Sequence, residues 1–154
     1  MSQLLRLYRR AVSVLFPLQS VMLLAVRLYW GFQFAQTGWG KLHNLARITG
    51  FFASLNIPSP GFNAPFVSTL EFVGGILLML GLFSRPVAFL LAFDMFVAYW
   101  AGDHDALTSV FSDPGKFYTA DPYTFLFASL MILIFGTGFL AIDRLIAKRL
   151  EIAE

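Results

Sequence analysis

The sequence predicts an all-α integral membrane protein, folded as a four-helix bundle of membrane-spanning segments. Of its 154 residues, 58% are hydrophobic and only 13% are charged, whereas soluble domains carry about 25% charged residues. The central apolar run, residues 65–100, is interrupted once, at residues 84–86. Each half is long enough, or nearly so, to cross a hydrocarbon core of about 30 Å. We therefore expect one membrane domain, residues 1–154, with a transmembrane hairpin at its centre.

The N-terminal segment, residues 1–16, is basic and amphipathic. Apolar residues recur there at helical spacing, with Arg6, Arg9 and Arg10 between them. Such a helix can lie on an anionic membrane surface, or it can simply flank the first span. Pro17 favours a new helix start, because proline suits the first helical position.

The first span is predicted over residues 18–38. Gly31 and Gly38 share one helical face with Arg27, and small residues on one face allow close helix packing. Residues 40–64 follow as a loop or short re-entrant segment whose apolar residues could form a helix along the interface.

The hairpin consists of spans at residues 65–83 and 86–101. Glu71 and Asp94 stand inside these apolar walls, each beside small residues on its own helical face. An acid at such a position is costly to bury, so it requires a partner or a function. A polar loop, residues 102–120, comes next.

The last span is predicted over residues 122–142. Asp121 and Pro122 have the residue types of an N-cap and a first helical position. A charged, amphipathic tail, residues 143–154, follows. Four spans place both termini on one side of the membrane.

The distribution of basic residues sets the expected orientation. The side that carries the termini has Arg6, Arg9, Arg10, Arg85, Arg144, Lys148 and Arg149, and the other side has Lys41, Arg47 and Lys116. Because basic residues concentrate in cytoplasmic segments, we expect both termini and the turn at residues 84–86 to be cytoplasmic.

Arg27, Glu71 and Asp94 form a candidate polar cluster inside the membrane. Measured from the cytoplasmic ends of their helices, they lie at depths of about 14, 18 and 12 Å. We expect Arg27 to pair with Glu71, with Asp94 as a second partner, and one acid to hold a proton. Two interpretations stay open: a proton or quinone site, and a structural ion pair that fixes the order of the helices.

Further candidate residues lie toward the outer face. Lys41, His43 and His104 are expected at the outer rim. A loop of neighbouring ligands does not converge easily on one ion, so we expect no metal or haem. The rings that could line a quinone pocket are Tyr29, Trp30, Tyr99 and Trp100, although interfacial anchoring also explains them.

Several motifs together resemble those of the DoxX family of small bacterial four-helix membrane proteins. The resembling residues, in three blocks, are Arg27, Gly31, Phe34, Gly38 and Lys41; then Phe52, Leu55, Ile57, Pro58 and Pro60; then Glu71, Gly74, Gly75, Leu80, Gly81, Leu82, Ser84, Arg85, Met95 and Ala98. The block from Glu71 to Arg85 is the most specific. Asp94 and the acidic loop at residues 102–121 depart from the family's pattern, as does Asn56, where a glycine is common.

This resemblance implies a multi-pass protein of the bacterial inner membrane that is tied to redox metabolism. The first expectation is a subunit of a quinone-linked system similar to thiosulfate:quinone oxidoreductase, inactive alone, with quinone as its cofactor. The alternative is a non-catalytic anchor or assembly factor for a redox or respiratory complex, and a third option is a permease subunit for small solutes or metals. Expected partners are membrane lipids and other protein subunits, and the net charge of +2 gives no reason to expect nucleic acid.

Overall fold

The computed structural model describes residues 3–138 and 140–150 of the chain, and this part is helical without strands. The predicted all-α class is therefore confirmed. The long helices are α1 (Gln3–Leu42), α3 (Pro60–Leu80), α4 (Ser84–Gly102) and α7 (Pro122–Phe135), and the short ones are α2 (Leu45–Ser54), α5 (His104–Thr108), α6 (Pro114–Thr119) and α8 (Ile142–Leu150).

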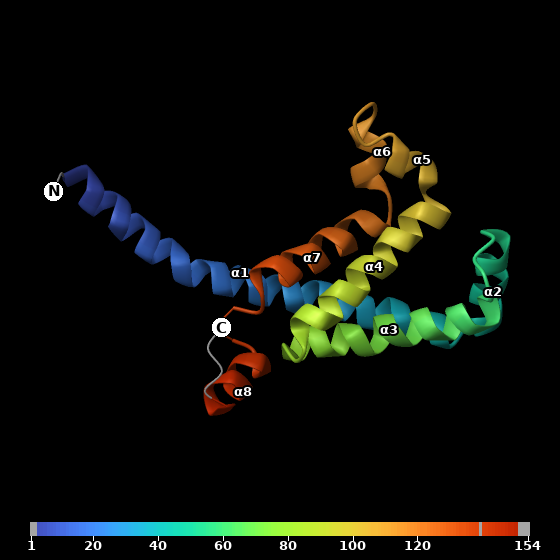
Figure 1. Ribbon diagram of the computed structural model, residues 1–154, viewed down its shortest axis with the longest axis horizontal. Helices are drawn as coiled ribbons and strands as arrows, with labels where there is room; N and C mark the ends of the chain where they lie inside the picture. The colour runs from blue at the N-terminus through green and yellow to red at the C-terminus, as the bar shows by residue number, and fades with distance from the viewer. Residues whose placement is uncertain (1–2, 139, 151–154) are drawn as a thin grey trace.

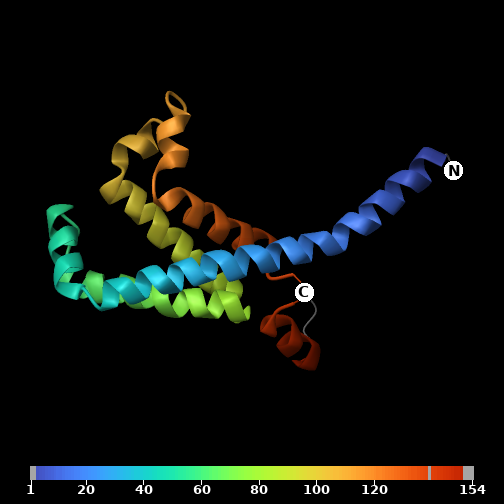
Figure 2. The same ribbon diagram turned by 180° about the vertical axis from the view of Figure 1, so that it is seen from behind.

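The four long helices form two packed pairs, α1 with α3 and α4 with α7. Figures 1 and 2 show the α4–α7 pair crossing the α1–α3 pair at an angle, with the tight turn between α3 and α4 linking them. The buried core lies at this crossing and contains Phe34, Leu78, Leu91, Met95 and Ile132. Each long helix thus contributes apolar side chains to one shared core.

The α1–α3 pair packs with its backbones in contact. A Cβ atom added to Gly31 would lie 2.8 Å from the carbonyl oxygen of Gly75, and one added to Gly75 would lie 2.5 Å from the backbone nitrogen of Ala35. At Gly38 the same atom would lie 2.7 Å from the carbonyl oxygen of Ser68. The glycines therefore set the short distance between these helices, as the small-residue pattern predicted.

The first helix differs from the prediction. α1 continues through Pro17 without a new start there, although an interior proline removes one helical hydrogen bond. The N-terminal part of α1 extends beyond the other helices (Figure 1), and Leu7, Tyr8 and Leu15 are exposed on it. Among the described side chains of α1, the first buried one is Ser20, close to the start of the predicted span at residues 18–38.

The last predicted span is also interrupted. α7 ends at Phe135, and residues 136–138, 140 and 141 are not helical before α8 begins. Gly136 and Gly138 have φ angles of 77° and 71°, in the left-handed region that glycine adopts without steric cost. By length and composition, one helix among the described residues qualifies as a membrane span, Pro60–Leu80.

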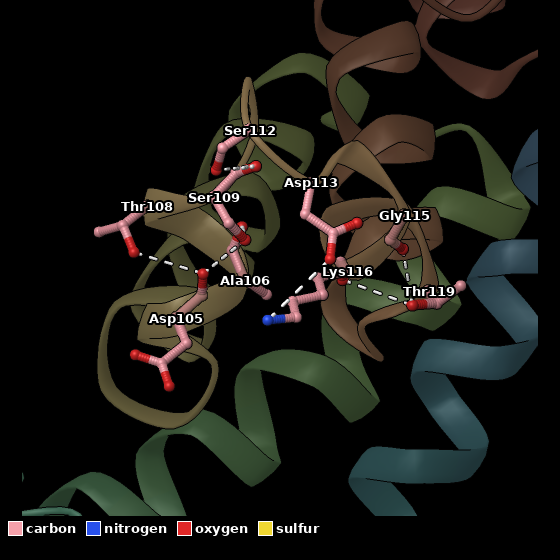
Figure 3. A network of polar contacts seen from close by, with 9 residues as sticks. All are labelled: Asp105, Ala106, Thr108, Ser109, Ser112, Asp113, Gly115, Lys116 and Thr119. Atoms are coloured by element: carbon pink, nitrogen blue, oxygen red, sulfur yellow. Dashed lines mark hydrogen bonds and ion pairs between the residues drawn. The ribbon is translucent and has the colours of Figure 1, made fainter.

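The segments predicted as loops contain short helices. α2 turns away from the ends of α1 and α3, and α5 and α6 stand at the far end of α4 and α7 (Figure 1). Figure 3 shows the α5–α6 segment, in which the Ser109 hydroxyl donates to the carbonyl oxygen of Asp105 at 2.7 Å. α7 begins at Pro122 as predicted, but the Asp121 side chain makes no capping hydrogen bond.

Candidate functional site

An ion pair between α1 and α3 is the centre of the candidate site. Lys41 Nζ donates to Glu71 Oε1 at 2.5 Å. Glu71 is 2% exposed, whereas the Lys41 side chain is 31% exposed. Lys41 follows the close contact at Gly38 by less than one helical turn, and helical side chains lean toward the N-terminus of their helix. The short distance between α1 and α3 therefore lets the lysine reach a carboxylate inside the bundle.

Asp94 brings a second carboxyl group to this ion pair from α4. It is 8% exposed and lies level with Glu71, because each acid is three residues from the contact of Gly74 with Leu91 on the antiparallel helices α3 and α4. Glu71 Oε2 and Asp94 Oδ2 are buried without a hydrogen-bond donor among the described residues. Lys41, Glu71 and Asp94 together are called the carboxyl site below.

The carboxyl site can accept a proton on chemical grounds. With all three groups ionised, its net charge is negative, and a buried uncompensated charge is costly. Two carboxyl groups in contact share a proton readily, because like charges at that distance cannot both ionise cheaply. The arrangement is therefore suited to proton transfer, and also to holding three helices together.

Arg27 lies elsewhere, and its predicted pairing with Glu71 is wrong. Its guanidinium is 1% exposed and donates from one terminal nitrogen to Thr137 O at 2.8 Å and from the other to Leu140 O at 2.7 Å. The reason is the position of α1: Arg27 lies level with Gly81 at the α3–α4 turn, where a Cβ atom would be 2.8 Å from its guanidinium. Lys41 takes the place that the sequence assigned to Arg27.

Asp143 completes the contacts around this turn, and the sequence analysis missed it. Its two carboxylate oxygens accept hydrogen bonds from the backbone nitrogens of Phe83 at 2.7 Å and Ser84 at 2.9 Å. Its own backbone nitrogen donates to Gly81 O at 2.9 Å. Asp143 thus caps the start of α4, where the sequence offers no capping side chain at Phe83. An acid in the first turn of the last amphipathic helix, α8 (Ile142–Leu150), was the available signal.

The four rings of the predicted quinone pocket are not brought together. Tyr29 and Trp30 contact each other on α1, with ring centroids 4.8 Å apart. Tyr99 is fully buried, stacks on Phe117 and donates its hydroxyl to Phe117 O at 2.6 Å. Tyr99 and Trp100 also follow the α3–α4 turn by about 22 Å of helix, while Tyr29 and Trp30 lie close to the level of that turn.

The predicted rim residues have different environments. The His43 Nδ1 donates to Trp39 O at 2.9 Å, and its ring centroid lies 4.2 Å from that of Trp39. His104 begins α5, and its ring meets the edge of Trp100 at 5.1 Å. Among residues 3–138 and 140–150, no three His, Asp or Glu side chains are placed to share a metal ion.

Comparison with known proteins identifies the family. The DoxX sequence pattern matches residues 22–104, a segment that includes all three residues of the carboxyl site and Arg27. "Inner membrane protein YqjF" of Escherichia coli (strain K12) is 28% identical over 133 residues, which cover 86% of this chain and 97% of that protein. "Putative oxidoreductase CatD" of Bacillus subtilis (strain 168) is 28% identical over 125 residues, 81% of this chain and 87% of that one. No solved structure matches. The chain belongs to the DoxX family.

Proposed function

We propose that the chain is a multi-pass protein of the bacterial inner membrane, in which α1, α3, α4 and α7 are the spanning helices and both termini are cytoplasmic. Large apolar side chains on the outside of the bundle support this, among them Phe89, Phe93, Phe96, Phe127 and Ile134. An apolar exterior is what a lipid-facing bundle requires. A relative of similar length is named as an inner membrane protein.

The broken end of α7 is consistent with that location. The 14 residues of α7 span about 21 Å, which is short of the hydrocarbon thickness. Residues 136–138 would therefore lie within or at the edge of the membrane. Irregular backbone is tolerated there only when its polar groups have partners. Arg27 provides two of them, through its hydrogen bonds to Thr137 O and Leu140 O.

The proposed activity is that of a subunit in a quinone-linked redox system, similar to thiosulfate:quinone oxidoreductase. The observation that carries it is the carboxyl site, in which two carboxyl groups are buried inside an apolar bundle and a lysine at the end of α1 donates to one of them. Such groups inside membrane proteins are costly and are commonly functional. A relative named as an oxidoreductase agrees with a redox role.

The surroundings of the candidate side chains indicate which of them could bind a quinone. The aromatic residues do not fit, because the Tyr99 hydroxyl is already bonded and the two ring pairs lie apart. Lys41 fits better, since it is partly exposed and can donate a hydrogen bond to a carbonyl oxygen while the carboxyl site holds or releases a proton. A bound quinone would supply the electron transfer, and Lys41 would orient it.

The test uses a mildly solubilised native preparation. We expect quinone to co-purify with the wild-type complex and thiosulfate to reduce quinone in its membranes, and we expect Glu71→Gln to abolish the reduction. Asp105→Asn is the matched control, because Asp105 is an exposed acid outside the site. Full activity in Glu71→Gln, at normal protein level, would refute the proposed role.

A second candidate function is a non-catalytic anchor or assembly factor. The observation that favours it is the N-terminal part of α1, which extends beyond the bundle with Leu7, Tyr8 and Leu15 exposed (Figure 2). In this case a partner protein would co-purify equally with wild type and with Glu71→Gln. That result, together with unchanged redox activity of the complex, would favour the anchor over the quinone-linked subunit.

A further inference from the structure

We propose that Glu71 and Asp94 together hold one exchangeable proton at neutral pH, balanced by Lys41 and exchanged with water on the side where Lys41 is exposed. The inference rests on the proposed membrane location, and it names the proton as the ligand of the carboxyl site. It does not depend on which electron donor or acceptor the protein serves.

The charges of the site support a single proton. One ammonium group, from Lys41, donates to the Glu71 carboxyl at 2.5 Å, and Asp94 is the second buried carboxyl group of the site. With both acids ionised the site would retain one uncompensated negative charge in a low-dielectric interior, which is costly. One proton makes the site neutral, and a second would leave the ammonium group unbalanced.

The positions of the carboxyl oxygens also support a single proton. Glu71 Oε2 and Asp94 Oδ2 are buried and have no donor among the described residues, and Asp94 lies level with Glu71 across the contact of Gly74 with Leu91. Two carboxylates cannot donate to each other, so a hydrogen bond between them requires a proton on one of them. A single proton both neutralises the site and supplies its missing donor.

Other charged groups do not replace this proton. α7 has no Asp, Glu, Lys, Arg or His between Pro122 and Phe135, and Arg47, on α2, is exposed. Arg27 lies level with Gly81, about 15 Å along α3 from Glu71, and its terminal nitrogens donate to carbonyl oxygens. Lys41 is thus the cation that sets the charge balance.

The exposure of Lys41 gives the direction of exchange. Glu71 is 2% exposed and Asp94 is 8% exposed, whereas Lys41 is 31% exposed at the α2 end of α1. A lysine side chain is flexible and keeps its ammonium group near water while its stem packs on apolar surface. Movement of Lys41 would therefore admit water from the α2 end, which is the predicted outer side.

Infrared spectroscopy of the purified full chain in lipid, without added quinone, tests the proposal. A protonated carboxyl group has a C=O stretch distinct from that of a carboxylate, and it shifts when the proton exchanges for deuterium. At neutral pH we expect one such band in the wild type, shifted in heavy water. It should be lost in Asp94→Asn and in Glu71→Gln, because the remaining acid then pairs with Lys41.

Lys41→Met makes the sharpest comparison. Without the ammonium group, two protons are needed for neutrality, so the band should double in area. Asp105→Asn is the control and should leave it unchanged. A wild-type spectrum without the band would overturn the proposal before any variant is measured. A band that fails to shift in heavy water would overturn it too. So would a band that sodium removes at constant pH, because a cation would then replace the proton. A missing quinone in the native preparation would leave this result intact, so the two proposals fail separately.

Discussion

Replacing Gly38 by alanine tests whether the contact between α1 and α3 is as close as the structure shows. The added methyl group would lie 2.7 Å from Ser68 O and 2.8 Å from Phe72 Cα, whereas ordinary contact begins at 3.4 Å. These neighbours are backbone atoms, so no side-chain rotation can relieve the clash. The backbone nitrogen of Phe72 would lie closer still, so the two helices must separate by at least about 0.7 Å at this point, the difference between 3.4 and 2.7 Å.

The expected loss follows from that separation. A gap of about 0.5–1 Å removes a quarter to a half of the dispersion attraction between the separated atoms, and overpacking a tight contact typically costs about 1–3 kcal/mol. We expect Gly38→Ala to lower the free energy of unfolding by this amount. The ion pair between Lys41 and Glu71 should weaken as well, because Lys41 follows Gly38 on the same helix.

Gly40→Ala is the matched control, two residues away on the same helix. A Cβ atom at Gly40 meets nothing within 4 Å, so alanine should be neutral or stabilise the helix by up to about 1 kcal/mol. Reversible unfolding in mixed micelles, followed by helical circular dichroism, measures both variants. Equal stability of Gly38→Ala and Gly40→Ala would refute the close-contact interpretation.

Three further predictions concern the turn between α3 and α4 and the orientation of the chain. Arg27→Met should lower the free energy of unfolding by about 3 kcal/mol or more, since hydrogen bonds to charged groups contribute about 1.5–3 kcal/mol each. Hydrogen exchange should also accelerate at residues 137–143. Arg85 is exposed, so the control Arg85→Met should have little effect on either measurement. Asp143→Ala should cost about 1–2 kcal/mol in thermal unfolding, through loss of the cap on α4; unchanged stability would show that water replaces it. In intact cells, an impermeant thiol reagent should label His104→Cys but not Arg85→Cys, and the reverse pattern would overturn the cytoplasmic termini.

Much of the architecture was predictable from hydrophobicity and turn residues. The hairpin expected at residues 65–83 and 86–101 is α3 and α4, with the turn at residues 81–83 instead of 84–86. Helix packing through small residues was expected as well, and Gly31, Gly38 and Gly75 provide it. These features depend on local pattern, which a sequence shows directly.

The pairing of charges was harder, because it depends on how far each helix extends. The depth of Arg27 was counted from a helix start at Pro17, but α1 continues through this proline. The alignment of α1 with α3 is set instead by the contacts of Gly31 with Gly75 and of Gly38 with Ser68, which place Arg27 beside Gly81 and Lys41 within reach of Glu71. A depth counted from the predicted helix start therefore assigned the wrong cation to Glu71.

The end of α7 shows a second difficulty, since glycine has two uses that a sequence does not separate. Glycines such as Gly136 and Gly138 can serve close helix packing, but here they adopt positive φ and interrupt the predicted span at residues 122–142. The partner of the resulting free carbonyl groups, Arg27, lies 110 residues away from Thr137. A contact across that separation has no local signal.

The ion pair between Lys41 and Glu71 should act as a coupled unit inside the bundle. A double-mutant cycle with Lys41→Met, Glu71→Gln and the double variant measures this coupling as a difference in the free energy of unfolding. Lys41→Met alone leaves two carboxyl groups without a cation, and the second change removes one of them. We predict that the double variant loses less stability than the sum of the single losses, by about 0.5–3 kcal/mol. Strictly additive losses would contradict the coupling of Lys41 with Glu71.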